Sequence, residues 1–145
     1  MDARNFLALA QQLSLSATEA AWRSAVSRAY YAAFHTARQL MESLGFHVPR
    51  ADRAHAYLWL RLANCGELQV ENAGQALNDL RRDRNWADYD LVRFLSQSLS
   101  QNDSSFAARI IQVLESAALE PTRSTITAAM KIYERDVLHD VTWHP

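Results

Sequence analysis

The scarcity of helix-breaking residues is the feature that most limits the folds open to this chain. Its 145 residues include three glycines and three prolines, whereas a β-rich chain needs turn residues at short, regular intervals. No stretch shows sustained alternation of apolar and polar residues between turn residues, so strands have little support. The sequence therefore predicts an all-α protein.

Apolar residues recur at the three- and four-residue spacing of amphipathic helices along most of the chain. Ser16 and Glu19 have the spacing of a capping box before a long alanine-rich helix, and the polar segment 96–105 predicts a loop or a polar first turn. The predicted helices cover approximately residues 3–13, 17–44, 51–65, 70–89, 106–119 and 122–137. Short connections favour antiparallel neighbours, so we expect an up-and-down bundle of four to five antiparallel helices.

The composition fits one globular domain that spans residues 1–145. Hydrophobic residues make up 49% and charged residues 21% of the chain, which is sufficient apolar content for an ordered core. The single cysteine, Cys65, has no internal disulfide partner and fits a reducing compartment. The chain starts without the features of a signal peptide and lacks the roughly 20-residue apolar run of a membrane span. We therefore expect a cytoplasmic protein without a membrane segment.

Charge and motif content narrow the function classes. The formal net charge of −1 provides no global positive field, so any contact with RNA must be local. The histidines and the cysteine form neither a CxxC pair nor an HxxxH pair, so no metal site is predicted. Three glycines at 45, 66 and 74 cannot build a glycine-rich phosphate loop. We expect no cofactor.

Two of the predicted helices carry a polar stripe along one face. Charged and hydroxyl side chains on a mostly buried helix are costly to bury without partners, so each stripe requires a complementary surface or a ligand. Asp88 is a natural carboxylate partner for Arg84 on its own helix or for Arg28 on the other. The stripes consist of Arg28, Tyr31 and His35 in the second helix and of Arg81, Arg84 and Asp88 in the fourth.

Two short segments on these helices resemble the HEPN superfamily. They read SRAYYAAFH at residues 27–35 and RNWADY at residues 84–89. More narrowly, they are similar to small stand-alone prokaryotic HEPN proteins, in which a histidine-containing helix lies between them and would carry His55. The resemblance implies a HEPN-like bundle of four or five helices and frequent homodimerisation. It also implies frequent pairing with a small nucleotidyltransferase antitoxin as a toxin–antitoxin module.

Many HEPN proteins are ribonucleases, and this chain departs from their motif. The motif is an arginine, a polar residue and a histidine four to six positions after the arginine. Arg84 and Asn85 fit, but the histidine positions hold Tyr89, Asp90 and Leu91. The general acid or base of metal-independent RNA cleavage is therefore missing. His35, Tyr89 or a residue of a second subunit remains as a substitute.

Two functional hypotheses and one structural alternative follow. The first hypothesis is a dimeric module that binds a nucleotide, RNA or a nucleotidyltransferase without turnover. The second is a toxin-like RNA endonuclease with Arg84, His35 and Tyr89 as catalytic residues. The departure at residues 89–91 favours the first. In the structural alternative, the stripes form a polar network that fixes helix register. The residues expected to bind are Arg28, Tyr31, Arg81, Asn85, Trp86 and Asp88.

Overall fold

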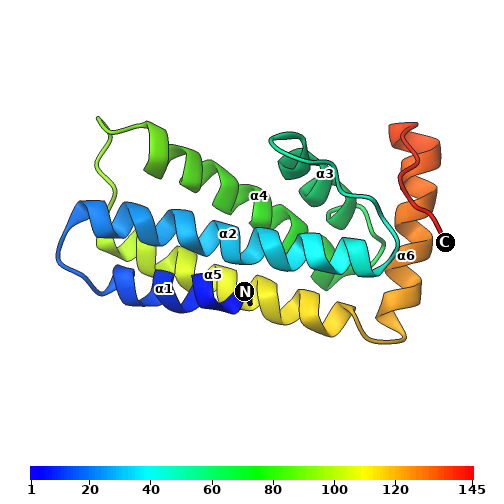
Figure 1. Ribbon diagram of the computed structural model, residues 1–145, viewed down its shortest axis with the longest axis horizontal. Helices are drawn as coiled ribbons and strands as arrows, with labels where there is room; N and C mark the ends of the chain where they lie inside the picture. The colour runs from blue at the N-terminus through cyan, green and yellow to red at the C-terminus, as the bar shows by residue number, and fades with distance from the viewer.

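Six α-helices form the protein in the computed structural model, which describes residues 1–145 (Figure 1). The prediction of an all-α fold is confirmed, because the structure contains no strand and its only bridge, between Phe46 and Trp143, is isolated. None of the helices combines the length and apolarity needed to cross a membrane. The helices are α1 (Arg4–Ser14), α2 (Glu19–Ser43), α3 (Arg53–Leu62), α4 (Leu68–Tyr89), α5 (Gln97–Ala117) and α6 (Thr122–Tyr133), followed by the π-helical turn η1 (Glu134–Leu138).

The four helices α1, α2, α4 and α5 run along the long axis of the molecule in alternating directions (Figure 1). Helix α2 is central and packs against α1, α4 and α5, while α3 packs mainly against α4. Helix α6 lies across one end of the bundle, next to the C-terminus (Figure 1). The predicted up-and-down helical bundle is therefore confirmed.

Alanine explains why α2 can pack closely against α1, α4 and α5. Its small side chains allow close approach of neighbouring helices, and the larger Tyr30 and Met41 fill the core between them. The predicted capping box is wrong, because Thr18, not Ser16, accepts the hydrogen bond from the Ala21 amide. The completely buried alanines of α2 are Ala25, Ala29, Ala32, Ala33 and Ala37.

Helix α5 begins at Gln97 and not at Phe106, so most of the segment expected to be a loop is helical. Ser96 caps this helix by accepting from the Leu99 amide. Buried Ser100 and Ser104 each donate their hydroxyl to a carbonyl of the preceding turn, at 2.7 and 2.9 Å. These local hydrogen bonds allow polar side chains to lie inside the bundle.

Gly74 lies inside α4, where α3 comes closest to it. A Cβ atom at this position would lie 2.6 Å from the Ala63 amide nitrogen and 2.9 Å from the Leu62 carbonyl carbon. The sequence marks this glycine only as a weak point in the helix. Its structural role is to let the backbones of two helices approach.

Candidate functional site

The polar stripes of α2 and α4 meet at the ring of Tyr31. The guanidinium carbon of Arg28 lies 5.3 Å from the centre of this ring, and that of Arg84 lies 5.1 Å from it. Both distances are typical of cation–π contacts. We name the surface formed by Arg28, Tyr31, His35, Arg84 and Asp88 the α2–α4 face. Two cations therefore lie against one half-buried aromatic ring.

Arg84 is held by neighbours on its own helix. Its Nε donates to Asp88 at 3.0 Å and a terminal nitrogen donates to the Asn85 side-chain oxygen at 3.1 Å. Asp88 also accepts from the Ser27 hydroxyl of α2 at 3.2 Å. Of the two partners that the spacing allowed for Asp88, the structure therefore selects Arg84. The ring of Tyr89 lies 5.5 Å from the Arg84 guanidinium.

Arg28 has no carboxylate partner. Its guanidinium lies between the Tyr31 ring and the ring of Phe6 in α1, which is 4.9 Å away. No hydrogen bond or ion pair engages its N–H donors. A guanidinium has five N–H donors in a planar fork that suits phosphate and carboxylate. Arg28 is thus the cation of this face that is free to take an anion.

His35 packs among aromatic rings. Its ring centre lies 5.2 Å from that of Phe34, 5.8 Å from that of Phe6 and 6.1 Å from that of Tyr31. Burial lowers the pKa of His35, and the positive charges of Arg38 and Arg28 lower it further. Its neutral form is therefore favoured at neutral pH.

The structure joins His55 of α3 to Tyr30 of α2. The Tyr30 hydroxyl lies 2.5 Å from His55 Nδ1, and both residues are buried. Burial lowers the pKa of His55, with further effects from Arg81 and Arg84, and raises the pKa of Tyr30. The rings of Tyr30 and His55 lie 5.2 and 6.3 Å from that of Tyr31, so the pair packs against the α2–α4 face. The sequence offered no sign of Tyr30 as the partner of His55.

Trp86 and Asn85 differ in position from the other residues expected to bind. The Trp86 indole N–H donates to the Arg93 carbonyl at 3.2 Å, and its ring lies 3.7 Å from the Arg93 guanidinium. Trp86 thus packs against the small cluster of Val26, Ala87 and Leu95, not against Tyr31. Asn85 is exposed and bonds Arg84, whereas Arg81 is half-buried.

Arg23 is a structural determinant of this region that spacing did not reveal. One of its terminal nitrogens donates to the carbonyls of Trp86, Ala87 and Asp90 at 3.2, 3.0 and 2.8 Å. The other donates to the Arg93 carbonyl at 2.5 Å. The buried guanidinium therefore closes the C-terminal end of α4 and fixes the loop that follows. The one sequence feature that could have indicated this role is the position of an arginine among the alanines of a central helix.

The HEPN domain family model matches residues 2–117. The chain belongs to the HEPN family. The matched region contains α1 to α5 and therefore the whole α2–α4 face. Comparisons with curated proteins and with solved structures found no match. Membership makes this chain a nucleotide- or RNA-related module, and the α2–α4 face is its candidate site.

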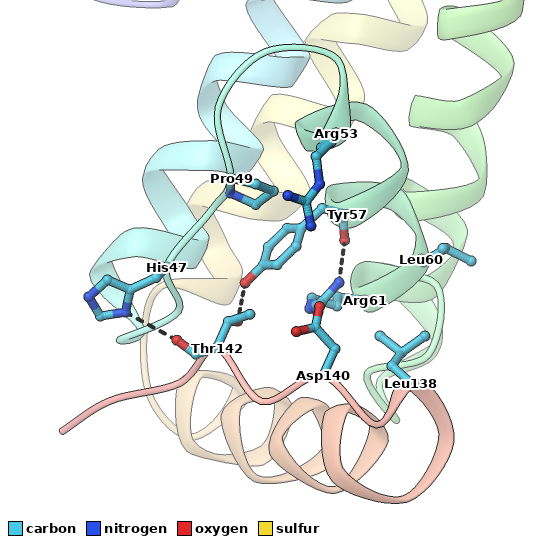
Figure 2. Close-up of a pocket in the computed structure, with 9 residues that line it drawn as sticks. All are labelled: His47, Pro49, Arg53, Tyr57, Leu60, Arg61, Leu138, Asp140 and Thr142. Carbon is cyan, nitrogen blue, oxygen red and sulfur yellow. Dashed lines mark hydrogen bonds and ion pairs between the residues drawn. The ribbon is translucent and has the colours of Figure 1, made fainter.

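A separate cavity of about 300 Å³ lies away from the α2–α4 face, between α3 and the C-terminal tail (Figure 2). Its main polar groups are already paired: Arg61 binds Glu134 at 2.7 Å, and the Tyr57 hydroxyl lies 2.5 Å from that of Thr142. Asp140 adds a longer contact of 3.4 Å to Arg61. Figure 2 shows Tyr57 and Arg61 of α3 facing Thr142 and Asp140 of the tail. This network fastens the tail, and none of the residues expected to function lies in it.

Proposed function

We propose that this HEPN domain binds RNA or a nucleotide through the α2–α4 face and does not cleave it. The observation that carries the proposal is the pair of arginines on Tyr31, of which Arg28 has no carboxylate partner. Arginine contacts phosphate oxygens in nucleic-acid complexes, and aromatic rings stack on unpaired bases. A local site of this kind suits a chain whose net charge is −1.

The environment of the histidines supports binding without turnover. Cleavage of RNA without a metal requires one group that accepts a proton and another that donates one. Burial lowers the pKa values of both His35 and His55, so neither favours the protonated form that a general acid needs. The Nδ1 atom of His55 is also hydrogen-bonded to the Tyr30 hydroxyl. The positions where ribonuclease members carry histidine hold Tyr89, Asp90 and Leu91.

The test follows a labelled single-stranded RNA oligonucleotide with purified protein, and measures binding and chain length in the same sample. We expect binding with intact RNA. Arg84→Ala should weaken binding at least about tenfold, by loss of a charge-assisted phosphate contact. Arg38→Ala, which removes a surface cation paired with Glu42, is the matched control and should bind as the wild type does.

A ribonuclease is the second candidate, and the position of Tyr89 favours it. This side chain is 73% exposed and its ring lies 5.5 Å from the Arg84 guanidinium. A phenol there could replace the missing imidazole, with Arg84 stabilising the phosphorane and His35 nearby as a base. RNA cut by the wild type but not by Arg84→Ala or Tyr89→Phe would establish this activity and refute the binding-only proposal.

We further propose that the protein acts as a homodimer in a cytoplasmic toxin–antitoxin type system, with a small nucleotidyltransferase as partner. The loop after α4 exposes apolar side chains, including Val92 at 98% and Phe94 at 64%. Such a patch is typical of interaction surfaces, and Arg23 holds its backbone in place. Light scattering of the purified protein should give twice the chain mass, and Val92→Asp should reduce it to the monomer. A monomeric wild type would refute the dimer.

A further inference from the structure

A group of carboxylates lies on a different side of α4, where this helix packs against α5. Asp79 and Asp83 of α4 and Asp103 of α5 line a cavity of about 130 Å³, which we name the acidic pocket. Asp103 is 1% exposed, and its Oδ2 atom has no hydrogen-bond partner. A buried carboxyl oxygen without a donor is rare in folded proteins. A donor is therefore missing from this pocket.

The two inner carboxyl groups also lack a cation. Arg82 pairs with Asp79 at the exposed rim, and no basic side chain pairs with Asp83 or Asp103. Both carboxyl groups line the same small cavity, and Asp103 Oδ2 has no hydrogen-bond partner in it. Burial, followed by the effects of neighbouring Asp83 and of Asp79, raises the pKa of Asp103 to about 9. At neutral pH Asp103 thus holds a proton that a bound cation would displace.

An apolar groove continues from the acidic pocket along the same two helices. It has a volume of about 290 Å³ and shares Ala76 and Phe106 with the pocket. Ile110 and Val113 of α5 extend its apolar lining. A ligand that fills both spaces has a cationic end and an apolar body. A metal ion does not fit this description, and no group of three or more acidic, histidine or cysteine side chains has metal-binding geometry.

We propose that the acidic pocket and the adjoining groove bind an organic cation, namely an amidinium, guanidinium or ammonium group carried on an apolar body. The cation donates N–H bonds to Asp83 and Asp103, and the proton that Asp103 held is released to solvent. The apolar body lies against Ala76 and Phe106. The site shares none of these residues with the α2–α4 face, so RNA binding and cation binding can fail separately.

Calorimetry with benzamidine tests this site, with benzamide as an uncharged control of the same shape. We expect benzamidine to bind at least about tenfold more tightly than benzamide. The measured enthalpy should change with the ionisation heat of the buffer, since about one proton is released for each cation bound at neutral pH. Equal binding of the two compounds, or no binding of benzamidine at millimolar concentration, would overturn the proposal.

Asp103→Asn tests the residue itself, because the amide keeps the shape of a carboxyl that is already uncharged. It should lower benzamidine affinity at least about tenfold and abolish proton release. Asp136→Asn, at an exposed site beside Arg135, should change neither. Asp83→Asn provides a second test should Asp103→Asn fail to fold, and unchanged affinity in a folded variant contradicts the site. Acetyl-Phe-Arg-amide, which carries an arginine side chain on a peptide, distinguishes two natural ligands. Binding tighter than that of benzamidine identifies the arginine of another protein as the ligand, and weaker binding identifies a free small cation.

Discussion

The guanidinium of Arg23 joins parts of the chain that lie far apart in sequence. It donates hydrogen bonds to the carbonyl oxygens of residues 86, 87, 90 and 93 and also pairs with Glu19 at 3.0 Å. These carbonyls belong to the end of α4 and the loop after it, where the partial negative charge of the helix accumulates. The position of Arg84 and Asp88 on the last turns of α4 therefore depends on a residue that contacts neither.

Replacement of Arg23 by methionine should destabilise the protein. Arg23→Met leaves the carbonyls of Ala87 and Asp90 without a donor and removes one donor from those of Trp86 and Arg93. We expect the free energy of unfolding to fall by about 3 kcal/mol. Urea denaturation followed by circular dichroism measures this change. Arg38→Met removes an exposed pair with Glu42 and should cost less than about 0.5 kcal/mol. Equal losses for the two variants would contradict the role given to Arg23.

Residue spacing predicted part of this arrangement. The i, i+3 and i+7 positions identified the stripes that meet at Tyr31, and they named Arg84 as a partner of Asp88, which it binds. They could not identify Arg23, because its acceptors are backbone carbonyls that every residue carries. Phe6 escaped notice because it belongs to another helix, whose placement depends on tertiary packing. The functional roles of the stripe residues remain predictions.

At the scale of elements, the contact of α3 with α4 depends on the absence of a side chain. Helix propensity alone would make Gly74→Ala stabilising by about 1 kcal/mol. The added Cβ would meet backbone atoms of Leu62 and Ala63 at 2.9 and 2.6 Å, and backbone cannot move aside cheaply. We expect a net loss of about 2 kcal/mol in the free energy of unfolding.

Thermal denaturation separates these two effects. Gln75→Ala, at the exposed neighbouring position of α4, is the control and should leave the melting temperature unchanged or slightly higher. Gly74→Ala should melt several degrees below the wild type. A stabilised Gly74→Ala protein would show that α3 and α4 do not approach as closely as described.

The start of α5 places an acidic side chain inside the bundle, and this has a consequence for pH dependence. The folded-state pKa of Asp103 is raised to about 9, above its unfolded value, so the folded chain retains a proton that the unfolded chain has lost. Stability is then full below the unfolded pKa and declines as pH rises toward about 9. The decline should amount to about 1 kcal/mol for each pH unit between about pH 5 and pH 8.

Asp103→Asn should remove this decline, because an amide has no proton to lose in this pH range. Urea denaturation of both proteins across this range should therefore show an advantage of the variant that grows with pH. A constant difference between the two proteins would indicate that Asp103 ionises normally in the fold.

Helices were predicted correctly where apolar residues recur at helical spacing over many turns. The prediction failed where it relied on the amino-acid composition of a segment. Helices α2 and α4 have sustained apolar spacing, and their predicted extents agree with the structure. The segment 96–105 has a composition typical of loops, yet its serines donate to carbonyls of the preceding turn and so become compatible with a buried helix. A single sequence does not distinguish these two uses of the same residues.

At the scale of the whole molecule, the bundle separates two surfaces of opposite chemistry. The α2–α4 face holds Arg28, whose charge no carboxylate balances, whereas the α4–α5 side holds the acidic pocket. The net charge of −1 hides this division. A nucleic-acid site in such a protein must be small, and its affinity should respond to salt through a few phosphate contacts only.

The most direct test of the account is a titration of single-stranded RNA with the wild type and Arg28→Gln at several salt concentrations, read by fluorescence anisotropy. We predict weaker binding by the variant and a slope of log affinity against log salt that is shallower by about 0.7, which corresponds to one lost phosphate contact. The same affinity and slope for both proteins, or no binding by the wild type, would contradict the assignment of the α2–α4 face as the RNA-binding site.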